Sequence, residues 1–302
     1  MRKTIGVLTA MSVEFKQIAS ILTDTKTEKI GPYDFLVGNL NDKQIVLMQC
    51  GIGKVNAASG VTNMIVHFHP DSVVSTGVAG GIDACLRVMD VVVSTQTCYH
   101  DVSCGEDVDP GQVQGLPRFF DSDKDMIGKS QTLETDIRIV PGLICTGDQF
   151  ITNRDQLNII KAAYPEGMAV DMESAAIAHV CHLYGLPFVS FRIISDTPGA
   201  EAHFETYLNF WQTMADKSFS VTRLFFGQSL IFLLFFFAFC SKNRNFAFAL
   251  GNGEMPEWSN GPHSKCGVLL RVPRVRIPVS PPGEYKEEGG CSRILLLLLS
   301  TK

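Results

Sequence analysis

The sequence lacks the patterns that mark several large classes of protein. Its nine cysteines include no Cys-X-X-Cys pair and no cysteine–histidine cluster at zinc-ligand spacing, which argues against a metal site or a disulfide framework. Basic residues are not in excess, because 26 Lys and Arg face 31 Asp and Glu, and the net charge of −5 gives no reason to expect nucleic acid as a partner. The apolar runs are too short to span a membrane comfortably. The scattered, odd number of cysteines favours reduced core thiols in a cytoplasmic protein.

The N-terminus also lacks a complete secretion signal, although it imitates part of one. Arg2 and Lys3 precede an apolar run at Ile5–Met11, but the run is short, ends at Glu14 and has no convincing small-residue cleavage site. We therefore expect a first buried strand there. The 302 residues, 45% of them hydrophobic, predict one or two domains of a soluble enzyme.

The stretch Val170–Asp196 combines acids, a helix and a buried strand. Apolar residues at helical spacing predict a helix that begins at Ser174 and ends before Gly185, a residue that tolerates positive φ. The run Phe188–Ile194 is β-rich and mostly apolar, as in a strand covered on both faces. A helix followed by a buried strand is typical of an α/β sheet.

Acidic side chains gather at one edge of this predicted sheet. Asp171 and Glu173 are expected at the helix start, and Asp196 just past the C-terminal end of the strand, where open α/β sheets bind ligands. Glu14 follows the predicted strand Thr4–Thr9 and reaches the same edge. Complementing the helix dipole explains Asp171 and Glu173 equally well, and taken alone Glu14 is better explained as an ordinary first-turn glutamate. Asp196 favours function, because acids avoid the end of a buried strand unless they have a task there.

Two glycine-rich segments follow predicted strands. Phe35–Leu40 and Gln44–Gln49 predict a hairpin, and Cys50–Ala58 then carries a Gly-X-Gly element without the third glycine of a dinucleotide fingerprint or a Walker lysine–threonine pair. This excludes NAD and ATP sites, and no cofactor is expected. After the strand Ser72–Ser75, Thr76–Gly81 contains three glycines, for which close approach to a substrate and a purely structural role are about equally plausible.

The middle of the chain continues the alternation of strands and helices. Strands are predicted at Val88–Ser94 and Leu143–Cys145, and a helix from Asn153, so the sheet should carry helices on both faces. His100 lies in a connecting loop and is interpreted as structural rather than catalytic. The segment Ser103–Pro117 is rich in Gly, Pro and Asp, which is typical of a functional or interface loop.

Six motifs in order carry a family resemblance: GVLTAMSVEF, GIGKVNAA, STGVAGG, TGDQFIT, VDMESAAIAHV and FRIISDTPG. Together they resemble the nucleoside phosphorylase and nucleosidase superfamily, and within it the 5′-methylthioadenosine/S-adenosylhomocysteine nucleosidases. The resemblance runs from Lys3 to about Phe226 and implies a three-layer α/β fold around a mixed, barrel-like central sheet. It also implies hydrolysis of the N-glycosidic bond of these two nucleosides, which releases adenine and the thioribose sugar.

The resemblance implies four catalytic residues. Glu14 would be the general base that activates water, Asp196 would protonate the purine N7, and Glu173 would hold the ribose hydroxyls. Arg192 would steady the water and the carboxylates. The chemistry agrees, because one acid must stay protonated near neutral pH while another is ionised, a division that parallels inverting glycosidases.

The resemblance also implies how substrate is bound. Phe150 and Ile151 would bind adenine, Met172 would lie against the sugar and Met11 would line the water site. Val78 stands where some relatives have a serine, so one polar contact to the water is expected to be missing.

Other departures concern the alkylthio pocket. Gln114 stands where a proline of the partner subunit often lines this pocket, and Tyr207 is the candidate after Asp196. Since the Ser103–Pro117 loop completes the partner's pocket in the resembling family, a homodimer is expected.

Three alternative functions remain open. A futalosine-type nucleosidase uses the same chemistry on another nucleoside. A nucleoside phosphorylase should carry an arginine for phosphate in the GIG loop, where this chain has Lys54. A non-catalytic nucleoside-binding module would not need the complete set of acids.

The domain is predicted to span residues 1–226, closed by a helix from Tyr207 to about Leu224, and Gly227–Lys302 differs abruptly in composition. Leu230–Cys240 is apolar all round and lacks the alternation of a folded domain. Gly253–Pro282 resembles a translated transfer RNA gene, because its codons can spell an acceptor stem, an anticodon stem and a T-loop. We interpret the tail as disordered read-through, with a membrane-anchoring tail as the alternative.

Overall fold

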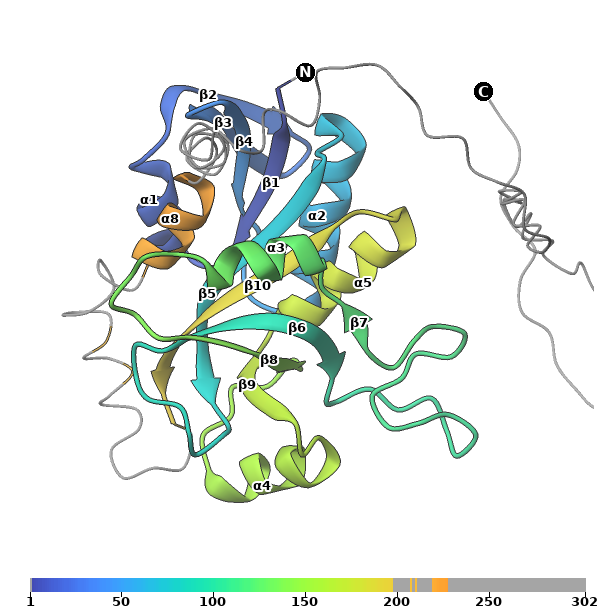
Figure 1. The fold of residues 1–302 in the computed structure, drawn as a ribbon. Coiled ribbons are helices and arrows are strands. Elements are labelled where there is room, and N and C mark those ends of the chain that lie inside the picture. Colours follow the sequence, from blue (N-terminus) through green and yellow to red (C-terminus); the bar gives the residue numbers. More distant parts are fainter. Residues whose placement is uncertain (1, 198–206, 208–209, 211–218, 228–302) are drawn as a thin grey trace, which may run out of the picture. The chain divides into compact units, whose positions relative to one another are not determined.

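The computed structural model describes residues 2–197, 207, 210 and 219–227, and one ten-stranded mixed sheet organises them. The strands are β1 (Thr4–Thr9), β2 (Thr23–Ile30), β3 (Tyr33–Leu40), β4 (Lys43–Gln49), β5 (Ser72–Gly81), β6 (Val91–Tyr99), β7 (Phe120–Asp121), β8 (Ile139–Thr146), β9 (Gly167–Asp171) and β10 (Phe188–Asp196). Five of them close on themselves in the order β10–β6–β8–β9–β5, because β5 also pairs with β10 (Figure 1). The outer strands β1, β4, β3 and β2 extend the sheet from β5, which confirms the barrel-like mixed sheet.

Helices cover both faces of this sheet. They are α1 (Ser12–Ala19), α2 (Lys54–Phe68), α3 (Lys124–Gln131), α4 (Arg154–Ala163), α5 (Ser174–Tyr184) and α8 (Ser220–Gly227). On one face, α2 and α5 pack together over apolar side chains of β1, β4 and β5. On the other, apolar side chains of α1, α3 and α8 share a core with β1, β4, β6 and β10. The three-layer prediction is therefore correct.

The glycine segment after Ser72–Ser75 is part of the strand rather than a loop. β5 continues to Gly81, where Gly80 and Gly81 pair with β9 and the same strand pairs with β10. The glycines allow close approach of other groups, since a Cβ at Gly77 would lie 2.7 Å from Glu14 Oε1. Close packing against a functional side chain, rather than a turn, explains this glycine.

Several element boundaries differ from the predictions. β6 begins at Val91 rather than Val88 and runs on to Tyr99, and β2, β7, β9 and α3 have no counterpart among the predicted elements. β2 reads TDTKTEKI and is largely exposed, so it shows no alternation of apolar and polar residues. The hairpin of β3 and β4 and the α4 start, where the Asn153 side chain accepts the Gln156 N–H, are confirmed.

The cysteine prediction is correct only in part. Four described cysteines are buried free thiols, and Cys85 and Cys104 are exposed. Among the described helices, none is long and apolar enough to cross a membrane.

The described residues belong to one compact unit. The helix predicted from Tyr207 to about Leu224 lies mostly outside the described residues, although α8 ends close to the expected position, at Gly227. The predicted read-through tail, with its transfer-RNA-like segment Gly253–Pro282, also lies outside them and stays a prediction.

Candidate active site

A cavity of about 650 Å³, counting its open mouth, lies at the sheet edge where β5, β9 and β10 end. Every site residue predicted from the sequence lines it except Arg192: Met11, Glu14, Val78, Phe150, Ile151, Met172, Glu173, Asp196 and Tyr207. The structure therefore brings together residues that are far apart in the sequence.

Glu14 lies in the first turn of α1, with its carboxylate buried in the cavity wall. Its Oε2 accepts the backbone N–H groups of Ala10 and Met11, both at 2.9 Å, and its Oε1 accepts the N–H of Val78 at 3.1 Å. Burial raises the pKa of Glu14, and these hydrogen bonds and the positive charge of Arg192 oppose that effect only in part. A carboxyl with a raised pKa is a stronger base when ionised.

Glu173 is the N-cap residue of α5 and faces the glycine loop before α2. Its Oε1 accepts the Gly53 N–H at 2.9 Å, and its Oε2 lies 3.8 Å from Nη2 of Arg192. Burial, followed by the negative charge of Asp171, raises the pKa of Glu173 to about 7. This carboxyl can therefore change its protonation state near neutral pH.

Asp196 is the last residue of β10, rather than lying just past the end of the strand as predicted. A β-bulge between Ile194 and Asp196 makes Ser195 an extra residue, after which Asp196 pairs with Gly80. A bulge of this kind can redirect a side chain at a strand end. The Ser195 hydroxyl donates to Asp196 Oδ1 at 2.6 Å, and Asp196 is 3% exposed.

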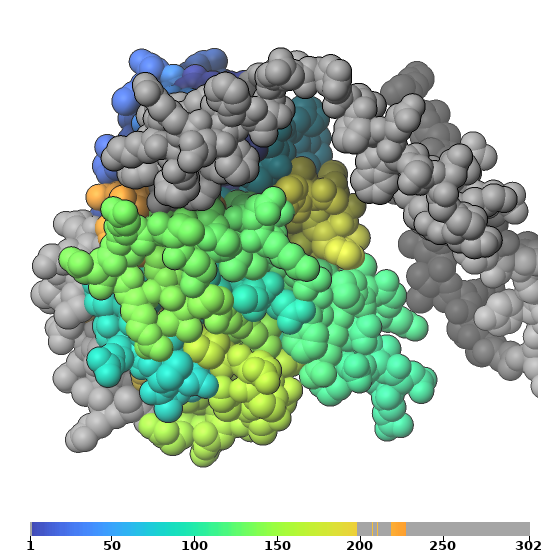
Figure 2. Space-filling view, in the orientation of Figure 1, coloured from blue at the N-terminus to red at the C-terminus, as the bar shows by residue number. Residues whose placement is uncertain are grey.

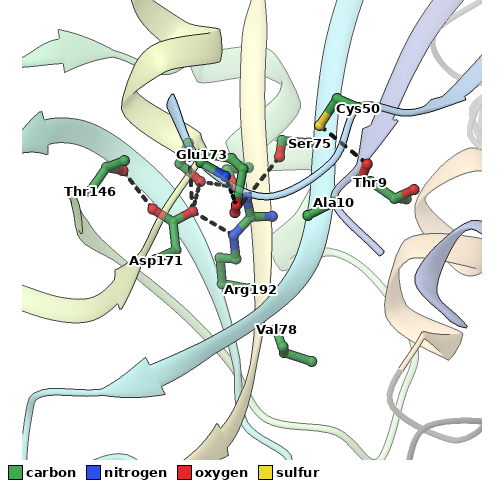
Figure 3. A network of polar contacts seen from close by, with 12 residues as sticks. Thr9, Ala10, Cys50, Ser75, Val78, Thr146, Asp171, Glu173 and Arg192 are labelled. Carbon is green, nitrogen blue, oxygen red and sulfur yellow. Dashed lines mark hydrogen bonds and ion pairs between the residues drawn. The ribbon is translucent and has the colours of Figure 1, made fainter. Parts of the chain in front are cut away.

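Arg192 lies behind the cavity wall, fully buried among polar groups (Figure 3). Its Nε donates to Asp171 Oδ2 at 2.6 Å, and its Nη2 donates to the Ser75 hydroxyl at 3.0 Å. Asp171 also accepts hydrogen bonds from the hydroxyls of Thr146 and Ser174. Asp171 is therefore the last residue of β9 and part of a buried ion pair, not merely a helix-start acid.

The residues predicted to bind substrate differ in exposure. Phe150 is 48% exposed and makes an edge-on contact with the Tyr207 ring, with centroids 5.7 Å apart. Ile151 is buried, whereas Met11 and Met172 are half-buried at the cavity wall. An exposed aromatic ring over a partly apolar cavity can stack on a planar base.

The two departures from the family pattern have different surroundings. Val78 offers its backbone N–H to Glu14, so the wall keeps one polar contact although the side chain has none. Gln114 is exposed in the irregular Ser103–Pro117 loop and does not line the cavity. This loop projects beside β7 and its surface is visible in teal-green in the space-filling view (Figure 2).

Lys54 is paired by two acids rather than directed to the cavity. Its Nζ lies 2.7 Å from Asp101 and 3.7 Å from Asp148, and its backbone N–H donates to Asp148 at 2.8 Å. His100 packs against Gly147 outside the cavity, consistent with a structural role. Within the described part of the chain, no group of His, Cys, Asp and Glu could hold a metal ion.

Sequence reasoning did not single out several other cavity residues: Ala10, Ile52, Ala79, Gln149, Val170 and Ser195. Most lie next to a residue that was identified. Ser195 could have been found from the ISD motif, because a serine beside an acid at a strand end can orient its carboxyl.

A model of the phosphorylase superfamily matches residues 4–226. A 5′-methylthioadenosine/S-adenosylhomocysteine nucleosidase from Actinobacillus succinogenes is 43% identical over 209 residues, which cover 68% of this chain and 91% of that protein. The structure of the nucleosidase of the same name from Neisseria meningitidis, in complex with methylthio-immucillin-A, aligns with a TM-score of 0.72 and 34% identity over 75% of this chain and all of that one. A futalosine hydrolase from Helicobacter pylori aligns with a TM-score of 0.70 and 28% identity, over 74% and 97% of the two chains.

Proposed function

This chain belongs to the phosphorylase superfamily, in which it is a 5′-methylthioadenosine/S-adenosylhomocysteine nucleosidase, and on that basis we propose which of its side chains carry the reaction. The enzyme hydrolyses the N-glycosidic bond of these nucleosides and releases adenine and the thioribose sugar. The observation that carries the assignment of roles is the meeting of three buried carboxyl groups, Glu14, Glu173 and Asp196, at one cavity.

Glu14 is the general base that removes a proton from the attacking water. Three backbone N–H groups hold its carboxylate still, and burial makes it a stronger base than an exposed glutamate. Because the water attacks as the glycosidic bond breaks, positive charge that develops on the sugar is close to a buried carboxylate.

Asp196 is the general acid that delivers a proton to N7 of the departing adenine. A neutral leaving group departs more easily than an anion, so this proton transfer lowers the barrier. The Ser195 hydroxyl, donating to Oδ1 at 2.6 Å, supports the orientation of the carboxyl.

Glu173 and four neighbours bind the substrate. Glu173 accepts the ribose hydroxyls, and Met172 and Met11 pack against the sugar and the water site. Phe150 and Ile151 hold adenine by stacking and by backbone hydrogen bonds. Tyr207, in edge-on contact with Phe150, closes the same side of the cavity.

The anion-binding donors of the site are occupied by the chain's own carboxylates, which favours water over phosphate as the nucleophile. The Glu14 carboxylate accepts hydrogen bonds from the N–H groups of Ala10, Met11 and Val78. Lys54 forms ion pairs with acidic side chains. Phosphate would have to displace a buried carboxylate, so phosphorolysis is disfavoured.

A homodimer is supported by exposed apolar side chains on two neighbouring helices. Val55 of α2 is 79% exposed, and Leu183 and Tyr184 of α5 are 61% and 49% exposed. Exposed apolar groups on adjacent helices, next to the irregular Ser103–Pro117 loop, are typical of a protein interface. Sedimentation of the active enzyme tests this, and a fully active monomer would contradict it.

The catalytic domain is proposed to end with α8, in a cytoplasmic protein. The Phe226 carbonyl accepts a hydrogen bond from Lys43 Nζ at 3.0 Å and the Gly227 carbonyl accepts one from Asn41 at 3.2 Å, so the hairpin of β3 and β4 satisfies the last turn of the helix. The family match also stops at residue 226. Buried free thiols are compatible with a reducing compartment.

Release of the free nucleobase from 5′-methylthioadenosine, S-adenosylhomocysteine and futalosine, measured with the same enzyme preparation, tests the assignment. We expect fast turnover of the first two, and preferential turnover of futalosine would transfer the assignment to that substrate.

Glu14→Gln is expected to bind the nucleoside without cleaving it, and cleavage at the normal rate would remove Glu14 from the mechanism.

A further inference from the structure

The Asp171 carboxylate accepts more hydrogen bonds than a helix cap requires. Its Oδ1 accepts the Thr146 hydroxyl at 2.5 Å, and its Oδ2 accepts the hydroxyl and the N–H of Ser174 at 2.5 and 3.1 Å. The same Oδ2 accepts Nε of Arg192 at 2.6 Å, and the side chain is 1% exposed. Such a cage fixes the position of a carboxylate.

One of the groups that donate to Asp171, the Ser174 hydroxyl, is itself hydrogen-bonded to a second set of buried groups. Since the Ser174 hydroxyl donates to Asp171, it must accept the proton of the Ser190 hydroxyl, 2.7 Å away. The Ser190 N–H donates to the Ser94 hydroxyl at 2.8 Å, which lies 2.6 Å from Ser122. This polar chain extends from the wall of the cavity into the core between β6 and β10.

The guanidinium of Arg192 is shared unequally between two carboxylates (Figure 3). The Arg192 Nε donates a hydrogen bond to Asp171, and its Nη2 donates one to the Ser75 hydroxyl. Glu173 is left 3.8 Å from Nη2, which is within ion-pair range but too long for a hydrogen bond. Glu173 thus keeps one oxygen on the Gly53 N–H and the other free of a direct bond to Arg192.

We propose that Asp171 is a positioning residue of the hydrolysis, which holds Arg192 by its Nε and so keeps the guanidinium from forming a direct hydrogen bond with the Glu173 carboxyl. The consequence is a Glu173 that is free to accept the sugar hydroxyls. This inference rests on the role proposed for Glu173, whereas Asp171 itself acts only through Arg192.

The pKa of Glu173 depends on where Arg192 and Asp171 lie, and it can be measured in the absence of substrate. The charged or titratable groups that face Glu173 are Asp171 on β9, Arg192 on β10, Glu14 on α1 and Cys50 after β4. Asp171→Asn removes one negative charge and releases Arg192 toward Glu173, while Glu14 and Cys50 stay unchanged. Both effects favour the ionised form of Glu173.

The first test compares four proteins by chemical unfolding from pH 5 to pH 8: wild type, Asp171→Asn, Glu173→Gln and the double variant. The difference between proteins with and without the Glu173 carboxyl gives the pKa of that carboxyl in each background. We expect a value near 7 in the wild-type background and at least about one unit lower with Asp171→Asn. An unchanged value, with stability lowered equally at all pH values, would show that Asp171 is only structural.

A second test uses nearly isosteric changes at two buried threonines and leaves Asp171 itself in place. Thr146→Val removes a hydroxyl that donates to Asp171 and accepts the Ala175 N–H, and Thr97→Val removes a buried hydroxyl on β6 for which the described structure has no hydrogen-bond partner. We expect kcat/KM for adenine release to fall about 10-fold to 100-fold with Thr146→Val, to recover with Thr146→Ser and to stay normal with Thr97→Val. Equal activity of the two valine variants would overturn the proposal.

The two tests separate the inference from the assigned function. Absence of adenine release by the wild-type enzyme would refute the function, whereas the Glu173 titration is measured by unfolding and needs no turnover.

Discussion

Replacing Glu173 by Gln should stabilise the protein above neutral pH while it abolishes most turnover. Burial raises the pKa of this carboxyl from 4.5 to about 7, and the charge of Asp171 adds to the effect. Because the folded state holds the proton more tightly than the unfolded chain, the destabilisation is absent below about pH 4.5, grows through this interval and is complete above about pH 7. At about 1.36 kcal/mol per pH unit, the interval is worth about 3 kcal/mol.

The free energy of unfolding of Glu173→Gln and wild type should be measured at pH 5 and pH 8. The difference between the two proteins should change by about 2–3 kcal/mol in favour of the variant on going to pH 8, or by about 5–10 °C in Tm. Any change in packing or hydrogen bonding that the amide itself introduces is the same at both pH values and cancels. Glu134→Gln, a change at an exposed glutamate, serves as the control and should show no such dependence. An equal difference at pH 5 and pH 8 would refute the reasoning.

Three further predictions concern the other acids and the end of the domain. Asp196→Asn should keep the Tm but lower kcat about 10²–10⁴-fold, because an amide cannot deliver the proton to adenine; near-normal turnover would exclude Asp196 as the acid. The kcat/KM of the wild type should fall as pH decreases through the raised pKa of Glu14, and a profile that is flat down to the pKa of an ordinary glutamate would contradict its role as the base. A chain that ends at Gly227 should keep full turnover and be more soluble, since Lys43 and Asn41 already satisfy the last carbonyls of α8; loss of folding would place the domain boundary further on.

The sequence predicted where the proposed catalytic acids lie, because strand ends are local features. An apolar run that ends in Asp196, and a strand followed at once by the helix of Glu14, define one sheet edge without knowledge of the whole fold. The same logic located Glu173 at the start of α5.

What sequence reasoning missed depends on contacts between distant segments. The barrel closes because β10 pairs with both β5 and β6, and no local pattern in the sequence predicts such pairing. The link from Asp171 to Arg192 crosses from β9 to β10, so Asp171 could not be distinguished from an ordinary helix-start acid. β2 was missed because its exposed, polar sequence lacks strand alternation.

The most direct test of the central claim is the dependence of adenine release on phosphate, with the sugar product identified by mass spectrometry. The enzyme should cleave 5′-methylthioadenosine at the same rate in phosphate-free buffer and in phosphate, and should release an unphosphorylated thioribose. Turnover that requires phosphate, or a sugar released as its 1-phosphate, would contradict hydrolysis by water activated at Glu14.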